Sequence, residues 1–106
     1  MMQCLEQVTF RLNPGSGPAD LRAALDQLKP WLQAQPGFQY STVTAEADTL
    51  THLVFWSTQG DAQAASAAIG AAPEAQALMA CINPDSVRMD HFQILQAYGP
   101  QVLEAA

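Results

Sequence analysis

The chain has 106 residues and a mass of 11.4 kDa, the size of one domain with a single core. Hydrophobic residues make up 49% of it, yet no apolar run approaches the roughly 20 residues of a membrane-spanning helix. Ten acidic residues against four scattered basic ones give a formal net charge of −6, which disfavours nucleic acids and anionic membranes as partners.

The two ends of the chain suggest a simple domain organisation. The N-terminal residues have neither a basic segment nor a long apolar core, so we expect no targeting peptide and a cytoplasmic protein. We expect one domain over residues 1–106, with a core at about 3–98 and a tail at 99–106.

Cys4 and Cys81 form no CxxC motif, which favours two buried free thiols.

The first predicted strand covers residues 3–12, where apolar side chains alternate. After a Gly- and Pro-rich loop, Pro18 suits the first position of a helix that we expect over residues 18–35. The apolar positions are Cys4, Val8, Phe10 and Leu12 in the strand, and Leu21, Ala24, Leu25, Leu28 and Leu32 along one side of the helix. We expect Pro30 to kink this helix or end its regular part near Lys29.

The second and third predicted strands form a hairpin. The second covers residues 38–44, and a polar turn follows at 45–49. The third strand lies in the most apolar run of the chain, residues 50–59. From Leu53 to Trp56 this run has no polar position. We therefore expect the third strand to be apolar on both faces.

Two helical segments and a last strand complete the prediction. Thr58 and Asp61 fit the capping box that starts a helix, which we expect to end near Gly70. A second helical segment is expected over residues 73–82, and the last strand over 87–98.

The resulting β-α-β-β-α-β order predicts an α+β, ferredoxin-like fold, with both helices on one face of a four-stranded antiparallel sheet. We place Val54 and Trp56, with Met89 and Leu95, on the uncovered face. Such an apolar face needs cover, and a second copy of the chain supplies it. This predicts a homodimer, a dimeric α/β barrel, with a cavity between the two sheets for a small hydrophobic or aromatic ligand.

Several short patterns carry a family resemblance over nearly the whole chain. They are Gln35-Pro36-Gly37-Phe38, Leu53-Val54-Phe55-Trp56-Ser57, a helix opening with Asp61-Ala62, and a final strand that bears a histidine. With these the chain resembles the dimeric α/β-barrel superfamily, and within it the antibiotic biosynthesis monooxygenase-like domains. The resemblance implies a cofactor-independent oxygenase that acts on a small aromatic compound.

Three residues are candidates for catalysis. The resemblance matches Trp56 to a tryptophan that lines the cavity beside the substrate, where its indole N–H could bind a carbonyl oxygen; the alternative is a tryptophan packed in the core of the dimer. His52 lies four positions earlier in the strand and so on the same face, and alternation assigns His91 to that face too. Either imidazole could act as the base, or be a hydrogen-bonded structural histidine.

Phe38, Tyr40 and Gln93 are the candidate substrate-binding residues. We expect no metal, because His52 and His91 have no carboxylate at ligand spacing. We also expect no cofactor, since the histidine and asparagine of the haem-degrading branch of the superfamily are missing here.

Three functions remain open from the sequence. The first is the cofactor-independent monooxygenase implied by the resemblance. The second is a non-catalytic, small-molecule-binding or stress-associated dimeric barrel. The third is a structural dimer whose cavity is filled by its own side chains.

Overall fold

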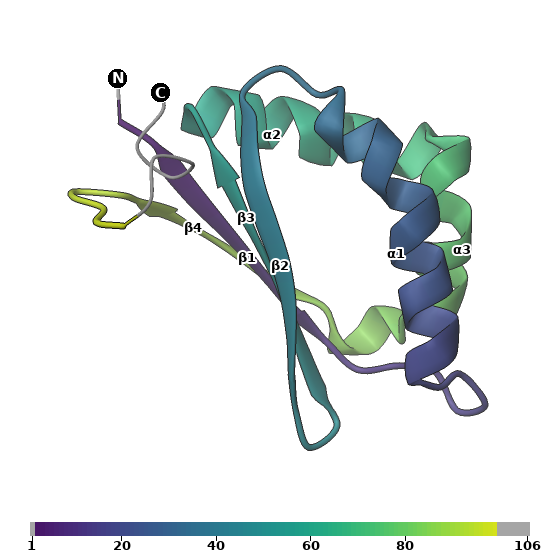
Figure 1. Ribbon diagram of the computed structural model, residues 1–106. Coiled ribbons are helices and arrows are strands. Elements are labelled where there is room, and N and C mark those ends of the chain that lie inside the picture. The colour runs from purple at the N-terminus through teal and green to yellow at the C-terminus, as the bar shows by residue number, and fades with distance from the viewer. Residues whose placement is uncertain (1, 100–106) are drawn as a thin grey trace.

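The computed structural model describes residues 2–99, and its elements follow the predicted order. One antiparallel sheet has the strand order β2-β3-β1-β4, and the helices cover one of its faces (Figure 1). The strands are β1 (Cys4–Phe10), β2 (Phe38–Glu46), β3 (Thr49–Trp56) and β4 (Arg88–Gln93); the helices are α1 (Pro18–Gln33), α2 (Gln59–Ala68) and α3 (Gln76–Cys81), with 3-10 turns η1 (Ile69–Ala71), η2 (Pro73–Ala75) and η3 (Pro84–Ser86). The α+β, ferredoxin-like prediction is confirmed.

Helix α1 continues through Pro30 to Gln33, so the predicted alternative that its regular part ends near Lys29 is wrong. Proline removes one backbone hydrogen bond, but Leu28 and Leu32 on either side are both buried in the core. Their burial holds the last turn in place, because tertiary packing supplies most of the stability of a helix in a protein.

The predicted cap of helix α2 is present. The Thr58 hydroxyl oxygen accepts a hydrogen bond from the backbone N–H of Asp61 at 3.1 Å, which satisfies one of the free donors of the first turn. Gly37, in the turn before β2, has φ of +80°, and a Cβ there would overlap the Asp61 side chain. Glycine is therefore required at residue 37 both for the backbone and for the close approach of α2.

The two faces of the sheet differ from the prediction for β3. We call the helix-covered side the inner face and the opposite side the outer face. Val54 and Trp56 are buried on the inner face, beside Cys4 and Glu6 of β1, so their predicted place on the uncovered face is wrong. The outer face instead carries Leu5, Tyr40, Leu53, Phe55 and Phe92.

The physical reason is that β3 is apolar at both parities, so alternation within β3 cannot say which side the helices cover. Pairing with β1 decides it. Cys4 pairs with Trp56 and Phe10 with Leu50, and these four side chains are all buried on the same side.

Strand β4 is shorter than predicted, since it ends at Gln93. Met89 pairs with Val8 and lies on the inner face, so its predicted place on the uncovered face is also wrong. Leu95 lies beyond the strand and is largely exposed. Of the predicted tail at 99–106, residues 100–106 lie outside the described part of the chain.

Candidate functional site

An apolar cavity of about 250 Å³ lies inside a single chain, between the inner face and the helices α1, α2 and α3. The prediction placed the ligand cavity between the sheets of two chains. In the structure the helices stand far enough from the sheet to leave space beside alanine positions of α2, among them Ala65. Small side chains at such positions fill less of the layer between helix and sheet.

Trp56 is the most buried large side chain of the cavity wall, with 1% of its surface exposed. Its ring packs edge-on against Phe38, with the ring centroids 5.9 Å apart. Within residues 2–99, its indole Nε1 is the one buried side-chain nitrogen or oxygen without a hydrogen-bond partner. A buried N–H that lacks a partner costs free energy, so this donor stands out in the core.

His52 lines the same cavity. It lies four residues before Trp56 in β3 and on the same, inner face. Burial lowers the pKa of its imidazole below the ordinary value of 6.5, and the negative charge of Glu6 partly offsets this. His52 is therefore neutral at pH 7 and able to accept a proton.

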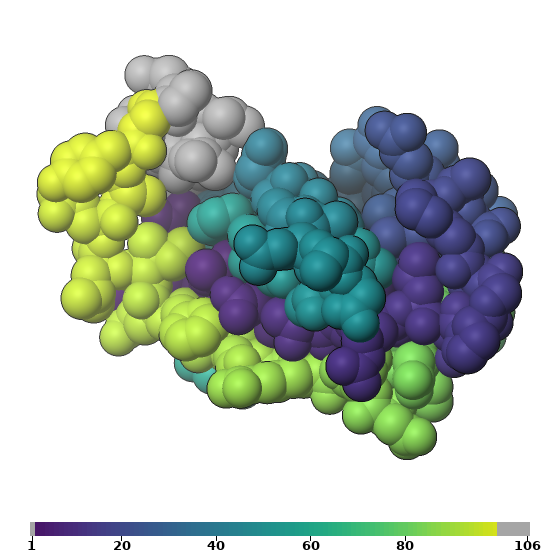
Figure 2. Space-filling view, turned by 90° about the horizontal axis from the view of Figure 1, so that it is seen from below, coloured from purple at the N-terminus to yellow at the C-terminus, as the bar shows by residue number. Residues whose placement is uncertain are grey.

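His52 also lines a second, more open space. This groove of about 440 Å³ runs between α1 and β2, and Figure 2 shows the surface hollowed there, between the blue helix and the teal strand. Leu28, Leu32 and His52 line both the cavity and the groove. They separate the buried space from the more exposed one.

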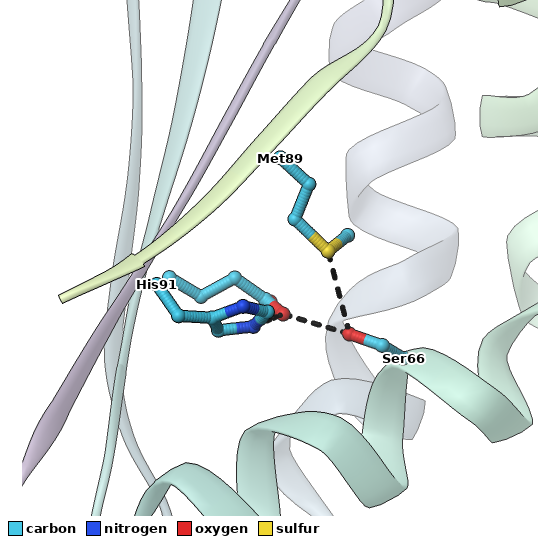
Figure 3. Close-up of polar contacts among 4 residues, drawn as sticks. Ser66, Met89 and His91 are labelled. Atoms are coloured by element: carbon cyan, nitrogen blue, oxygen red, sulfur yellow. Dashed lines mark hydrogen bonds and ion pairs between the residues drawn. The ribbon is translucent and has the colours of Figure 1, made fainter.

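A polar cluster joins the sheet to α2 beside the cavity. The Glu6 carboxylate, only 6% exposed, accepts a hydrogen bond from the Ser66 hydroxyl at 2.7 Å and lies 2.9 Å from Nε2 of His91. Figure 3 shows Ser66 reaching from the helix towards Met89 and His91 of the strand. Because an ionised carboxylate only accepts, Nε2 of His91 carries the proton in this contact.

The charge of Glu6 reaches beyond its two partners. Together with burial, which is the larger cause, it raises the pKa of the neighbouring Cys4 thiol. Cys4 is thus a protonated, buried thiol rather than a nucleophile. Cys81 is buried and free as well, so the prediction of two buried free thiols is confirmed.

The predicted site residues do not all meet at the cavity. His52 and Trp56 line it, and His91 reaches the wall through Glu6. Phe38 packs edge-on against the Trp56 ring. Tyr40 lies on the outer face against Phe55, and Gln93 lines a shallow groove near the start of α2.

Sequence reasoning missed Glu6 and Ser66, both of which line the cavity. A signal for Glu6 was present, because it occupies the inward parity of β1 between Cys4 and Val8. A carboxylate in an apolar row is rare unless it is paired. Ser66 had no comparable signal, since small residues surround it in α2.

Within residues 2–99, no group of three or more His, Cys, Asp or Glu side chains lies close enough to hold a metal ion. In the same part of the chain, no helix combines the length and the apolar character needed to cross a membrane.

The chain was compared with known families, curated proteins and solved structures. No family model and no curated protein matches it. Among solved structures it is similar to SnoaB, a cofactor-independent oxygenase from Streptomyces nogalater, with 21% identity over 92% of this chain and 97% of that one and a TM-score of 0.73. It is also similar to a candidate antibiotic biosynthesis monooxygenase from Bordetella bronchiseptica, with 17% identity over 91% of this chain and 100% of that one and a TM-score of 0.75.

A third similar structure is the monooxygenase ActVA-Orf6 of Streptomyces coelicolor, in complex with nanaomycin D, with 15% identity over 93% of each chain and a TM-score of 0.60. The chain has the fold of the antibiotic biosynthesis monooxygenase-like domains. The predicted resemblance is thus confirmed for the fold, and other proteins with this fold are of unknown function.

Proposed function

We propose that this protein is a cofactor-independent monooxygenase that acts on a small aromatic compound held in the inner cavity. The observation that carries the proposal is the buried indole N–H of Trp56, which lacks a partner in the wall of an apolar cavity. A substrate carbonyl oxygen is the group that fits such a donor. The shared fold with SnoaB and ActVA-Orf6 supports the reaction class.

The reaction needs a base, an acidic C–H group and oxygen. His52, neutral and in the cavity wall, removes the proton from a CH2 carbon whose carbanion is conjugated with the substrate carbonyl. The carbanion passes one electron to O2, and the two radicals combine to a peroxide. Loss of water then leaves a carbonyl, so that a CH2 group and O2 become C=O and H2O without an external reductant.

The outer face supports the homodimer that belongs to this proposal. Tyr40 and Phe92 are 40% and 48% exposed there, beside the partly buried Leu5, Leu53 and Phe55. An apolar surface of this kind on a sheet is covered when two copies pair face to face. The cavity in each chain then lies behind its own sheet, away from the pairing surface.

Oxygen consumption with dithranol tests the function. Dithranol is a dihydroxyanthrone, an electron-rich aromatic compound with an acidic CH2 group opposite the carbonyl in its central ring. We expect consumption of one O2 per dithranol, and Trp56→Phe should lower kcat/KM by about tenfold because it removes the indole N–H but keeps an aromatic ring. Trp31→Phe, at another position in the cavity wall, is the matched control and should change it little.

Two results would contradict the proposal. If dithranol binds but no oxygen is consumed, the protein is the non-catalytic binding barrel. If Trp56→Phe and Trp31→Phe act equally on kcat/KM, the indole N–H of Trp56 is not the carbonyl anchor.

A further inference from the structure

Glu6 has a place in the cavity that the proposed reaction does not use. It lines the cavity and is nearly fully buried, yet it is a carboxylate among apolar neighbours. The charge of a buried carboxylate must be offset by hydrogen bonds, and Ser66 and His91 provide two. Glu6 is thus held in one position as a charged group.

The two contacts leave part of the carboxylate unused. Among residues 2–99, the contacts from both Ser66 and His91 go to the same oxygen, Oε2. Ser66 has one hydroxyl proton and gives it to Glu6 at 2.7 Å, so its 3.8 Å contact with the Met89 sulfur is secondary. The Oε1 atom of Glu6 keeps its capacity to accept a hydrogen bond.

A purely structural carboxylate would satisfy both of its oxygens within the protein, as buried polar groups generally do. In this cavity wall the Oε1 of Glu6 accepts no hydrogen bond from a described residue, because both contacts go to Oε2. A ligand hydroxyl in the cavity can therefore donate to Oε1.

The remaining wall limits the charge of that ligand. Among the described residues that line the cavity, none is Lys or Arg, and Glu6 is the only carboxylate. His52 is held neutral by burial. An anionic ligand would therefore face a negative charge in an apolar space without a cation to offset it.

We propose that Glu6, positioned by Ser66 and His91, selects the ligand of this cavity: a neutral aromatic compound with a hydroxyl group that donates to Glu6, whereas aromatic carboxylates are rejected. This rests on the proposed function only in that it places an aromatic ligand in the inner cavity. Glu6 is the binding residue, and Ser66 and His91 are positioning residues.

Calorimetric titration with three matched probes tests the inference on the intact wild-type protein. β-Naphthol offers a hydroxyl donor, its methyl ether has the same ring without a donor, and β-naphthoate bears a carboxylate. We expect β-naphthol to bind about tenfold more tightly than the ether, as for a hydrogen bond to a charged group, and naphthoate more weakly than either.

Glu6→Gln sharpens the test. With Ser66 and His91 donating to the single amide oxygen, the NH2 group of glutamine faces the cavity in place of an acceptor. We expect the preference for naphthol over the ether to fall to about twofold or less and naphthoate binding to gain. Glu46→Gln, at the exposed end of β2, is the control and should leave all three affinities unchanged.

The outcomes separate this inference from the proposed function. Equal binding of naphthol and ether by the wild-type protein, or tighter binding of naphthoate, overturns the role of Glu6 while the oxygenase proposal stands. An unchanged preference in a folded Glu6→Gln variant also overturns it. If none of the three probes binds, both the inference and the placement of an aromatic ligand in the cavity are wrong.

Discussion

The inner and outer faces of the same sheet differ in packing and in exposure. The inner face combines a tightly buried core, with Val54 and Trp56, and a few polar groups around a cavity. The outer face has no helix cover, and beside the exposed Arg88–Asp90 ion pair its aromatic side chains, Phe92 among them, are partly exposed. Chemistry needs fixed, desolvated groups, whereas association needs an accessible apolar surface. This difference is the reason why we propose ligand binding on the inner face and assembly on the outer face.

The largest expected effect comes from the core of the inner face. Trp56→Ala removes the largest fully buried side chain and should lower the free energy of unfolding by about 3–5 kcal/mol. Urea denaturation measures the change. At a protein concentration where the chain is monomeric, Phe55→Ala on the outer face should cost less than about 2 kcal/mol, because Phe55 is only partly buried in the chain. Equal losses would mean that the two faces do not differ in packing.

An intermediate effect is expected on the outer face. Phe55→Asp places a charge in the apolar surface between two copies and should weaken association by at least tenfold, about 1.4 kcal/mol. Light scattering should then find a mass near the 11.4 kDa of one chain, against about twice that value for the wild-type protein. Gln63→Asp, on an exposed position of α2, should leave the dimer intact. A wild-type protein that is already monomeric would refute the pairing.

The smallest effect concerns the pH dependence of stability. His52 has a pKa below 6.5 in the folded chain, so below about pH 6.5 the unfolded chain binds more protons and unfolding becomes easier. As the pH is lowered below about 6.5, the free energy of unfolding should decrease, by at most about 1.4 kcal/mol per pH unit for one proton. His52→Gln should remove this part of the dependence. Denaturation curves of the two proteins from about pH 7.5 to about pH 5 measure it, and parallel profiles would contradict the role of burial.

Much of the fold follows from local chemistry. The leucine spacing of α1, the Thr58 cap of α2 and the alternation in β1 each depend on neighbouring residues, and each is found in the structure. The shared face of His52, Trp56 and His91 follows from their spacing and parity in the strands. The helix does not end before Pro30, because the burial of Leu28 and Leu32 in the core offsets the cost of the proline.

The sequence by itself determined the order of the elements, the inward row of β1 and the pair of histidines that share a face with Trp56. Only the tertiary structure decided which side of β3 the helices cover, because a strand apolar on both sides carries no such information and its partners do. It also brought Ser66 and His91, 60 and 85 residues from Glu6, to the same carboxylate. Contacts between residues so far apart depend on how the layers pack, and no local pattern encodes them.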